Sequence, residues 1–292
     1  MNAIATTKTY TPSQPIWCAG CGHYGVKNAL QYSMQALDIA GHETFVLAGI
    51  GCSGTIQNYI GAYGYHAMHG RVLPTATGVA LANPHLTVIA AGGDGDGYAI
   101  GGGHLLHTFK RNPSMVYIVM NNAVYGLTKG QDSPTMPEPT AAPEEQALDA
   151  IQLGLSIRGT TFLARGFTSR PAQLNRLMMQ ALEHARAKRG LAFLEILSPC
   201  VTYNDTYPLW DAMVIDKDAD ENYDNTNRAQ AMVTSLELSE QGRIPLGLLY
   251  RGDHPSYDSA FHRNAVTAPA LEDVKAPQQQ QLLRDILAEY KR

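Results

Sequence analysis

The chain has 292 residues and a formal net charge of −4, and 45% of its residues are hydrophobic while only 16% are charged. This length and composition allow one large domain or two small ones with a sizeable core. The slight negative charge gives no reason to expect nucleic-acid binding. No run of about 18 apolar residues occurs, and the first residues are polar, so we expect a cytoplasmic protein with no membrane-spanning segment.

Helical and strand patterns alternate from the start of the chain. Apolar residues recur at helical spacing in 23–40. Residues 44–48 predict a short buried strand, which runs into a glycine-punctuated loop at 49–54. Residues 77–82 predict a short helix, because an Asn-Pro pair closes them.

Two further apolar strands are expected in the middle of the chain, at 86–91 and 115–120. The first leads into Gly-Gly-Asp-Gly-Asp-Gly at 92–97, and a helix is expected to follow from about 98 to 111. The second strand ends at an Asn-Asn pair, 121–122. Both strands therefore carry polar residues at their carboxyl ends.

The next stretch, 133–143, contains four prolines and predicts an extended loop. A strand is expected at 160–164. A helix starts at Pro171 and is capped by Gly190, and a last apolar strand covers 191–197. Beyond 204 the alternation weakens.

An α/β fold follows from this alternation, with a parallel sheet covered by helices on both faces, because the strands are nearly all apolar. Functional loops of such sheets lie beyond the carboxyl ends of the strands. Cys52, Asp94, Asn122 and Cys200 all follow predicted strands. We therefore expect these four residues to converge at one edge of the sheet.

The C-terminal part carries weaker signals. A strand is expected at 246–250 and a terminal helix at 282–290. We interpret residues 1–203 as the main α/β domain and residues 204–292 as an arm that packs on this domain or on a partner.

Four cysteines are present, at positions 18, 21, 52 and 200. Disulfides are not expected in a cytosolic protein of this size. Four cysteines with one Cys-x-x-Cys pair are compatible with a tetrathiolate metal site. They are equally compatible with two reduced core cysteines and a redox pair, and the spacing leaves both interpretations open.

The loop that begins at Gly93 has the composition of a phosphate site, because glycine-rich loops expose backbone N–H groups. The dinucleotide fingerprint fails, since its sixth place is Tyr98 when counted from Gly93 and Ile100 when counted from Gly95; the P-loop Lys is also absent. Asp94 offers a carboxylate to Mg²⁺, which commonly joins one carboxylate to phosphates. An ordinary turn explains either this loop or the Asn-Asn pair alone, but the two together favour a magnesium–diphosphate site.

Longer motifs carry a resemblance to a known family. They are Trp-Cys-Ala-Gly-Cys-Gly-His, Gly-Ile-Gly-Cys-Ser-Gly, His-Gly-Arg, Gly-Asp-Gly-Asp-Gly-Tyr-Ala-Ile-Gly-Gly-Gly-His, Val-Met-Asn-Asn-Ala-Val-Tyr-Gly-Leu-Thr-Lys-Gly-Gln and Ser-Pro-Cys. They run in order from Trp17 to Cys200 and are similar to the β subunits of 2-oxoacid:ferredoxin oxidoreductases. The resemblance implies a thiamine-diphosphate-binding fold and coenzyme A-dependent oxidative decarboxylation of 2-oxoacids, with electrons passed to ferredoxin.

The resemblance also implies a role for individual residues of the main domain. Magnesium would be held by the side chains of Asp94 and Asn122 and by the carbonyl of Val124. Thiamine diphosphate would be lined by Ile50, Gly51, Cys52, Ser53, His69, Gly95, Asp96, Gly126 and Leu127. One [4Fe–4S] cluster would be held by Cys18, Cys21, Cys52 and Cys200.

Leu127 and Lys129 are the candidate catalytic residues. Leu127 stands where the large single-chain pyruvate enzymes have an Asn, so a step that depends on this Asn is not assumed. Lys129 could pair with the distal carboxylate that 2-oxoglutarate has and pyruvate lacks. The resemblance therefore implies the 2-oxoglutarate type, with the same chemistry on pyruvate or 2-oxobutyrate as the alternative. Lys129 is equally compatible with a position facing solvent or coenzyme A.

The pyrimidine-binding domain of thiamine enzymes is missing from the sequence, so the resemblance implies a separate α subunit as partner. Two other functions remain open. A non-redox thiamine-diphosphate lyase or synthase subunit would explain the aspartate loop but leaves the four cysteines without a task. A zinc-stabilised interaction domain would explain the cysteines but not the aspartate loop.

Overall fold

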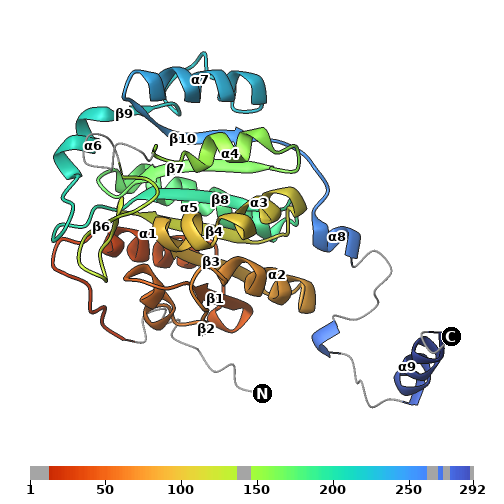
Figure 1. Ribbon diagram of the computed structural model, residues 1–292. Coiled ribbons are helices and arrows are strands. Elements are labelled where there is room, and N and C mark those ends of the chain that lie inside the picture. The colour runs from red at the N-terminus through yellow and green to blue at the C-terminus, as the bar shows by residue number, and fades with distance from the viewer. Residues whose placement is uncertain (1–12, 137–145, 262–268, 272–276, 290–292) are drawn as a thin grey trace.

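The computed structural model describes residues 13–136, 146–261, 269–271 and 277–289. An eight-stranded sheet with the order β2-β1-β3-β4-β8-β7-β10-β9 forms its centre (Figure 1). The strands of this sheet are β1 (Thr44–Ala48), β2 (Tyr63–His66), β3 (Thr87–Gly93), β4 (Val116–Asn121), β7 (Phe162–Phe167), β8 (Ala192–Leu197), β9 (Val214–Asp216) and β10 (Ile244–Arg251). Neighbouring strands are parallel except β7 and β10, which pair antiparallel.

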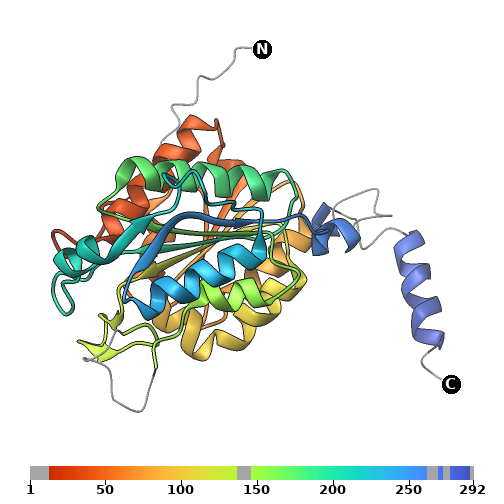
Figure 2. The same ribbon diagram turned by 90° about the horizontal axis from the view of Figure 1, so that it is seen from above.

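Helices cover both faces of the sheet, which is seen edge-on between them in Figure 2. The longer helices are α1 (His23–Ala36), α2 (Val72–Ala82), α3 (Gly102–Arg111), α4 (Ala150–Ser156), α5 (Pro171–Arg186), α6 (Tyr207–Met213), α7 (Arg228–Glu240), α8 (Tyr257–Phe261) and α9 (Pro277–Glu289). Apolar residues of α1 and α5 form one buried layer with the strands. Residues of α2, α3, α4 and α7 form the layer on the opposite face.

These layers exist because successive side chains of a strand point to opposite faces. In β4, Val116, Ile118 and Met120 belong to the first layer, whereas Tyr117 and Val119 belong to the second. All six residues of β4 are buried. The predicted α/β fold, with a mostly parallel sheet and helices on both faces, is therefore confirmed.

Several predicted boundaries were wrong. The first helix ends at Ala36 rather than 40, and the helix expected at 77–82 already begins at Val72. The helix expected from 98 is preceded by a π-helical segment, Gly95–Ile100. Of the extended loop expected at 133–143, residues 137–143 lie outside the described residues.

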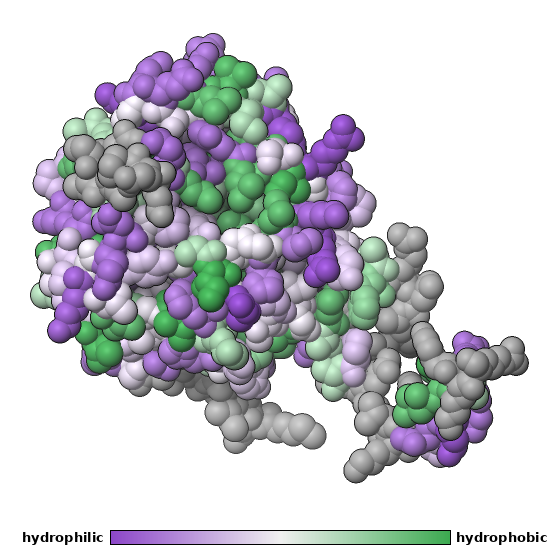
Figure 3. Space-filling model, in the orientation of Figure 1, coloured by the Kyte–Doolittle hydropathy of each residue, from purple (hydrophilic) through white to green (hydrophobic). Residues whose placement is uncertain are grey.

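The chain beyond 204 adds two strands to the sheet. Residues 214–216 and 244–251 form β9 and β10, and α7 contributes Ala231 to the second buried layer. In both ribbon views α9 is drawn apart from the sheet and its covering helices (Figures 1 and 2). Exposed apolar side chains gather on this helix, which lies at the lower right of Figure 3, and they are Leu282, Leu283, Ile286 and Leu287. The division at residue 203 stays a prediction.

Among the described helices, none combines the length and apolar character that a membrane crossing requires. The short elements that matter for the site are η2 (Ser53–Tyr59), the π-helical segment Gly95–Ile100 and the hairpin of β5 (Val124–Tyr125) and β6 (Gln131–Asp132). Each follows a strand of the parallel part of the sheet. They therefore gather at its carboxyl edge.

Candidate active site

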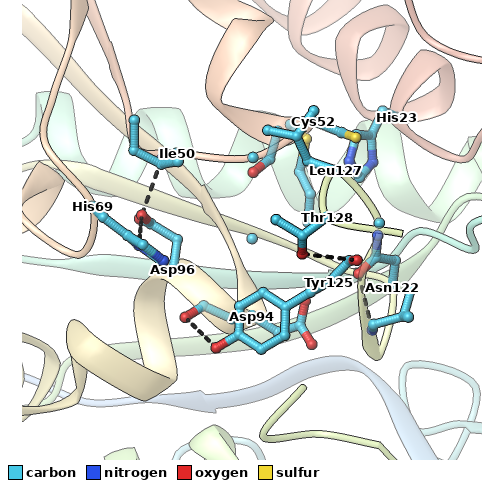
Figure 4. A pocket seen from close by; sticks show the side chains of 17 residues that line it. His23, Ile50, Cys52, His69, Asp94, Asp96, Asn122, Tyr125, Leu127 and Thr128 are labelled. Carbon is cyan, nitrogen blue, oxygen red and sulfur yellow. Dashed lines mark hydrogen bonds and ion pairs between the residues drawn. The ribbon is translucent and has the colours of Figure 1, made fainter. Parts of the chain in front are cut away.

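A cavity lies at this edge, between the loops that follow β1, β3 and β4 (Figure 4). All of the residues predicted to line thiamine diphosphate or to hold magnesium line this cavity. They are Ile50, Gly51, Cys52, Ser53, His69, Asp94, Gly95, Asp96, Asn122, Val124, Gly126 and Leu127. Loops that follow parallel strands converge at one edge of the sheet. For this reason residues up to 77 positions apart in the sequence meet here.

Asp94 follows β3 and is buried, with 1% of its surface exposed. The hydroxyls of Ser133 and Thr135 lie against one carboxylate oxygen, Oδ2, with the Thr135 contact at 2.7 Å. Burial raises the pKa of Asp94, and the hydrogen bonds from Ser133 and Thr135 oppose this rise. A cation beside the carboxylate would favour its charged form in the same way.

Asn122 directly follows β4 and begins the turn that leads into the hairpin. Its side-chain Oδ1 accepts the N–H of Val124 at 3.2 Å. Ala123 between them has a φ of 54°, a left-handed conformation that few residues other than glycine adopt. The Val124 carbonyl in turn accepts the Gly126 N–H at 3.0 Å. This tight turn brings amide and carbonyl oxygens to the same wall of the cavity as Asp94.

Asp96 joins three loops (Figure 4). Its Oδ1 accepts the N–H of Ile50 at 3.0 Å, the N–H of Gly70 at 2.8 Å and the ring Nδ1–H of His69 at 2.8 Å. Because His69 Nδ1–H donates its hydrogen bond to Asp96, the other ring nitrogen of His69 is left for the cavity. The position of Gly49 must be a glycine, since an added Cβ would collide with Asp96 Oδ2.

A second cavity adjoins the first and is lined by all four cysteines, Cys18, Cys21, Cys52 and Cys200. The two cavities share seven lining residues. These are His23, Ile50, Gly51, Cys52, Asn122, Gly126 and Leu127. The loop after β1, which carries Cys52, is therefore a common wall.

The four thiols lie near one another. Burial, together with the smaller effects of the charges of Cys200, Cys52 and Cys18, raises the pKa of Cys21 to about 11. Gly126 passes between two of them, since a Cβ added there would lie 3.6 Å from Cys200 Sγ and 3.9 Å from Cys52 Sγ. A side chain at this position would fill the space between the sulfur atoms.

The four cysteine thiols do not suit a single metal ion. Within the described residues, no three His, Cys, Asp or Glu side chains converge closely enough to hold one metal ion. The cysteine-lined cavity encloses about 400 Å³, whereas one water molecule occupies about 30 Å³. Four thiols around a space of this size fit a multi-atom group with thiolate ligands better than a lone zinc ion.

Trp17 fixes the first cysteine loop. Its indole N–H donates to the Cys52 carbonyl at 2.7 Å, and its ring meets Tyr24, Tyr59 and His23 edge-on. These contacts tie the Cys-x-x-Cys segment to the loop after β1. These side-chain contacts therefore set the positions of Cys18 and Cys21 relative to Cys52.

The sequence interpretation missed several lining residues, of which His23 is the most informative. His23 lines both cavities, and its Nδ1 lies 2.7 Å from Ser198 Oγ. Burial lowers its pKa to about 4, so the ring is neutral near pH 7. Its place directly after Cys-x-x-Cys-Gly was the available signal. Tyr125 and Thr128, which follow the turn at Asn122 and line the first cavity, were also missed.

Lys129 is not among the residues that line either cavity. It lies exposed in the turn of the β5–β6 hairpin with a φ of 79°. Leu127, two residues earlier, lines both cavities and is 61% exposed. The roles assigned to Leu127 and Lys129 stay predictions.

The chain is similar to known proteins over most of its length. The family described as "Thiamine pyrophosphate enzyme, C-terminal TPP binding domain" matches residues 38–196, and a second family, the C-terminal part of the beta subunit of pyruvate ferredoxin oxidoreductase, matches 200–265. The 2-oxoacid:ferredoxin oxidoreductase 2 subunit beta of Aeropyrum pernix is 41% identical over 80% of this chain and 79% of its own. The 2-oxoglutarate synthase subunit KorB of Methanocaldococcus jannaschii is 34% identical over 85% and 92%.

A solved structure is similar as well. It is the 2-oxoglutarate:ferredoxin oxidoreductase from Magnetococcus marinus with 2-oxoglutarate, coenzyme A and succinyl-CoA bound. Its matching chain is 33% identical, the TM-score is 0.82, and 94% of each chain is covered.

Proposed function

This chain belongs to the β subunits of the 2-oxoacid:ferredoxin oxidoreductases, and from this we propose that it oxidatively decarboxylates 2-oxoglutarate to succinyl-CoA and CO₂. It does so together with an α subunit that supplies a pyrimidine-binding domain. Ferredoxin takes the electrons, and coenzyme A takes the acyl group.

One observation carries the proposal. A cavity with a buried aspartate shares its wall with a cavity lined by four thiols. A thiamine-diphosphate enzyme without redox chemistry would need only the first cavity, and an interaction domain would need only the second. The common wall gives a reason for both to occur in one chain.

The first cavity fits thiamine diphosphate bound through Mg²⁺. Asp94, Asn122 and the Val124 carbonyl supply the hard oxygen ligands that Mg²⁺ prefers. His69, oriented by Asp96, presents a ring nitrogen to the diphosphate side. The bound cofactor supplies the electron sink for decarboxylation.

The second cavity fits one [4Fe–4S] cluster, held by Cys18, Cys21, Cys52 and Cys200. Such a cluster supplies one-electron steps. Cys52 sits in the wall that faces the other cavity, so the cluster would lie next to the cofactor. His23 lies at the same wall, and as a neutral ring it adds no charge there.

The choice of 2-oxoglutarate rests on Lys129 and on relatives named as acting on 2-oxoglutarate. The hairpin holds Lys129 directly after Thr128, which lines the first cavity. A cation there can pair with a distal carboxylate once the α subunit covers the hairpin. Pyruvate has no such carboxylate.

The test is the activity of the purified α/β complex on 2-oxoglutarate, 2-oxobutyrate and pyruvate, with ferredoxin or a viologen dye as acceptor. We expect the highest kcat/KM for 2-oxoglutarate and strict dependence on coenzyme A. The β chain alone is the control and should not turn over, because the carboxylate that activates the aminopyrimidine would lie on the α subunit.

Metal analysis separates this function from its rivals. The complex should be brown, with about four irons per β chain. A colourless protein with zinc would favour an interaction domain, and a colourless protein that decarboxylates without an electron acceptor would favour a lyase. A higher kcat/KM for pyruvate would overturn the choice of substrate but leave the reaction class intact.

A further inference from the structure

A buried ion pair lies beneath the active-site loops, on two central strands. Arg165 of β7 and Glu195 of β8 are directly opposite each other in the strand register. They are 6% and 2% exposed, and Arg165 Nε donates to Glu195 Oε2. All residues of β8 are buried, and apart from Glu195 they are all apolar.

Fold stability does not explain this pair. Replacing a buried ion pair by apolar residues of similar volume is often neutral or stabilising by about 1–4 kcal/mol. Arg165 already has a second carboxylate partner, since its Nη2 donates to Asp149 Oδ1 at 3.0 Å. The hydrogen bonds that Glu195 accepts from Tyr98 and Asn121 indicate a role other than stabilising the fold.

Glu195 reaches the loop after β3 through Tyr98. The Tyr98 hydroxyl donates to Glu195 Oε1 at 2.7 Å, and only 5% of Tyr98 is exposed. Tyr98 belongs to the π-helical segment that follows Asp94 directly. Such segments are rare and occur mostly at functional sites. Glu195 therefore anchors the segment that carries the first magnesium ligand.

Glu195 Oε1 is also connected to the loop after β4, through Asn121 at the end of that strand. The Asn121 side-chain amide donates to Glu195 Oε1 at 3.2 Å. The other side-chain atom, Oδ1, accepts the Ala123 N–H at 3.0 Å and lies 2.9 Å from the Thr135 hydroxyl. That hydroxyl is 2.7 Å from Asp94 Oδ2. One carboxylate is thus connected to both magnesium-binding loops.

We propose that Glu195, with its charge balanced by Arg165, is a positioning residue that holds the Asp94 loop and the Asn122 loop in register for Mg²⁺. The role rests on the proposed function of the first cavity. Glu195 touches neither the cofactor nor the substrate. It fixes the distance between two ligands that come from different strands, and residues behind metal ligands typically change metal affinity by about 10- to 100-fold.

A matched pair of double variants tests this role. Arg165→Met with Glu195→Gln removes both charges and keeps an acceptor oxygen for Tyr98 and Asn121. Arg165→Met with Glu195→Leu removes the charges and the acceptor. Magnesium-dependent binding of thiamine diphosphate to the α/β complex is measured by equilibrium dialysis at graded Mg²⁺. We expect affinity within a few-fold of wild type for the Gln variant and a loss of about 10- to 100-fold for the Leu variant.

Asp258 provides the control for a general loss of stability. It is 2% exposed, accepts the Ser114 N–H at 2.8 Å and lines neither cavity. Asp258→Ala should lower the melting temperature of the complex, because the buried Ser114 N–H loses its acceptor, and should leave the Mg²⁺ affinity unchanged. Iron content should stay at the wild-type level in all variants, because no cysteine contact is altered.

Equal Mg²⁺ affinity of the two double variants would overturn the positioning role, because only the acceptor oxygen differs between them in function. A loss of affinity in Asp258→Ala equal to that in the Leu variant would overturn it too. Absence of magnesium-dependent binding in the wild-type complex would overturn the proposed function of the cavity, and the role with it.

Discussion

Asp96→Ala removes the acceptor that joins three loops around the first cavity. In the folded chain Asp96 Oδ1 accepts from Ile50 N, Gly70 N and the His69 ring. The alanine variant leaves the two backbone N–H groups without this acceptor. The side chain of His69 also loses the contact that sets its orientation.

The size of the effect follows from burial. An unsatisfied buried donor costs roughly 1–3 kcal/mol. Gly70 is fully buried and should lose this amount, whereas Ile50 is half-buried, so water can replace part of its lost bond. We therefore expect the local opening equilibrium at Gly70 to rise about 5- to 150-fold, the factor that corresponds to 1–3 kcal/mol.

Hydrogen exchange of individual backbone amides measures this opening. The Gly70 amide should exchange faster in Asp96→Ala, while the amide of Leu194 in the buried strand β8 reports global unfolding. Asp96→Asn is the matched control, because it keeps one acceptor oxygen without the charge. Its hydrogen bonds should be about half as strong, so exchange at Gly70 should be intermediate.

Unchanged exchange at Gly70 in Asp96→Ala would refute the idea that this carboxylate holds the loops together. Equal acceleration at Gly70 and Leu194 would show that the whole fold is weakened rather than these loops. Thiamine diphosphate affinity should fall with the loss of protection, because His69 then lacks a fixed orientation.

Four further expectations follow from the structure. Asp94→Ala should abolish magnesium-dependent binding of thiamine diphosphate and keep the brown colour; wild-type affinity would contradict its role as a ligand. Cys52→Ser should lower the iron content and the activity together, and full iron occupancy would remove Cys52 from the ligand set. Lys129→Ala should lower kcat/KM for 2-oxoglutarate much more than for pyruvate, and equal losses would exclude it as the selector. Burial lowers the pKa of His184 to about 4, so its contribution to stability is present above about pH 6.5, the usual histidine value, and is lost toward pH 4. As the pH is lowered over this range, the urea midpoint of His184→Gln should therefore fall less steeply than that of the wild type. The same slope in both proteins would contradict this expectation.

The central strands were predictable because burial on both faces leaves a continuous apolar signal. β1 was predicted with its observed bounds, and β3, β4 and β8 within one or two residues. Since these strands are parallel neighbours, the loops after them had to share one edge. This topological reason brought Cys52, Asp94, Asn122 and Cys200 together before any side-chain contact was known.

The peripheral elements lacked such a signal. All four residues of β2, Tyr63–His66, are exposed, so no apolar pattern marks this edge strand. β9 has only three residues. For α4 a signal existed and was overlooked: Asp149 caps the helix by accepting the N–H groups of Ile151 and Gln152. The antiparallel pairing of β10 with β7 also depends on tertiary packing rather than on local pattern.

Within the site, residue types were predictable but their connections were not. Asp96 was assigned to the diphosphate side from its motif, yet its partners Ile50 and His69 lie 46 and 27 positions away. No local pattern encodes such contacts. Glu195 was counted only as part of an apolar strand. The single carboxylate within the apolar strand Ala-Phe-Leu-Glu-Ile-Leu was the available signal that this strand does more than pack in the core.

The common wall between the two cavities limits how the sequence can vary. A substitution at Gly51, Cys52 or Gly126 changes the surroundings of both cavities at once. Variation that adapts one cavity without disturbing the other must therefore fall on residues that line only one of them, such as Thr128 on one side and Val201 on the other. Attempts to alter substrate choice without altering electron transfer should begin at Thr128 and its neighbours in the hairpin.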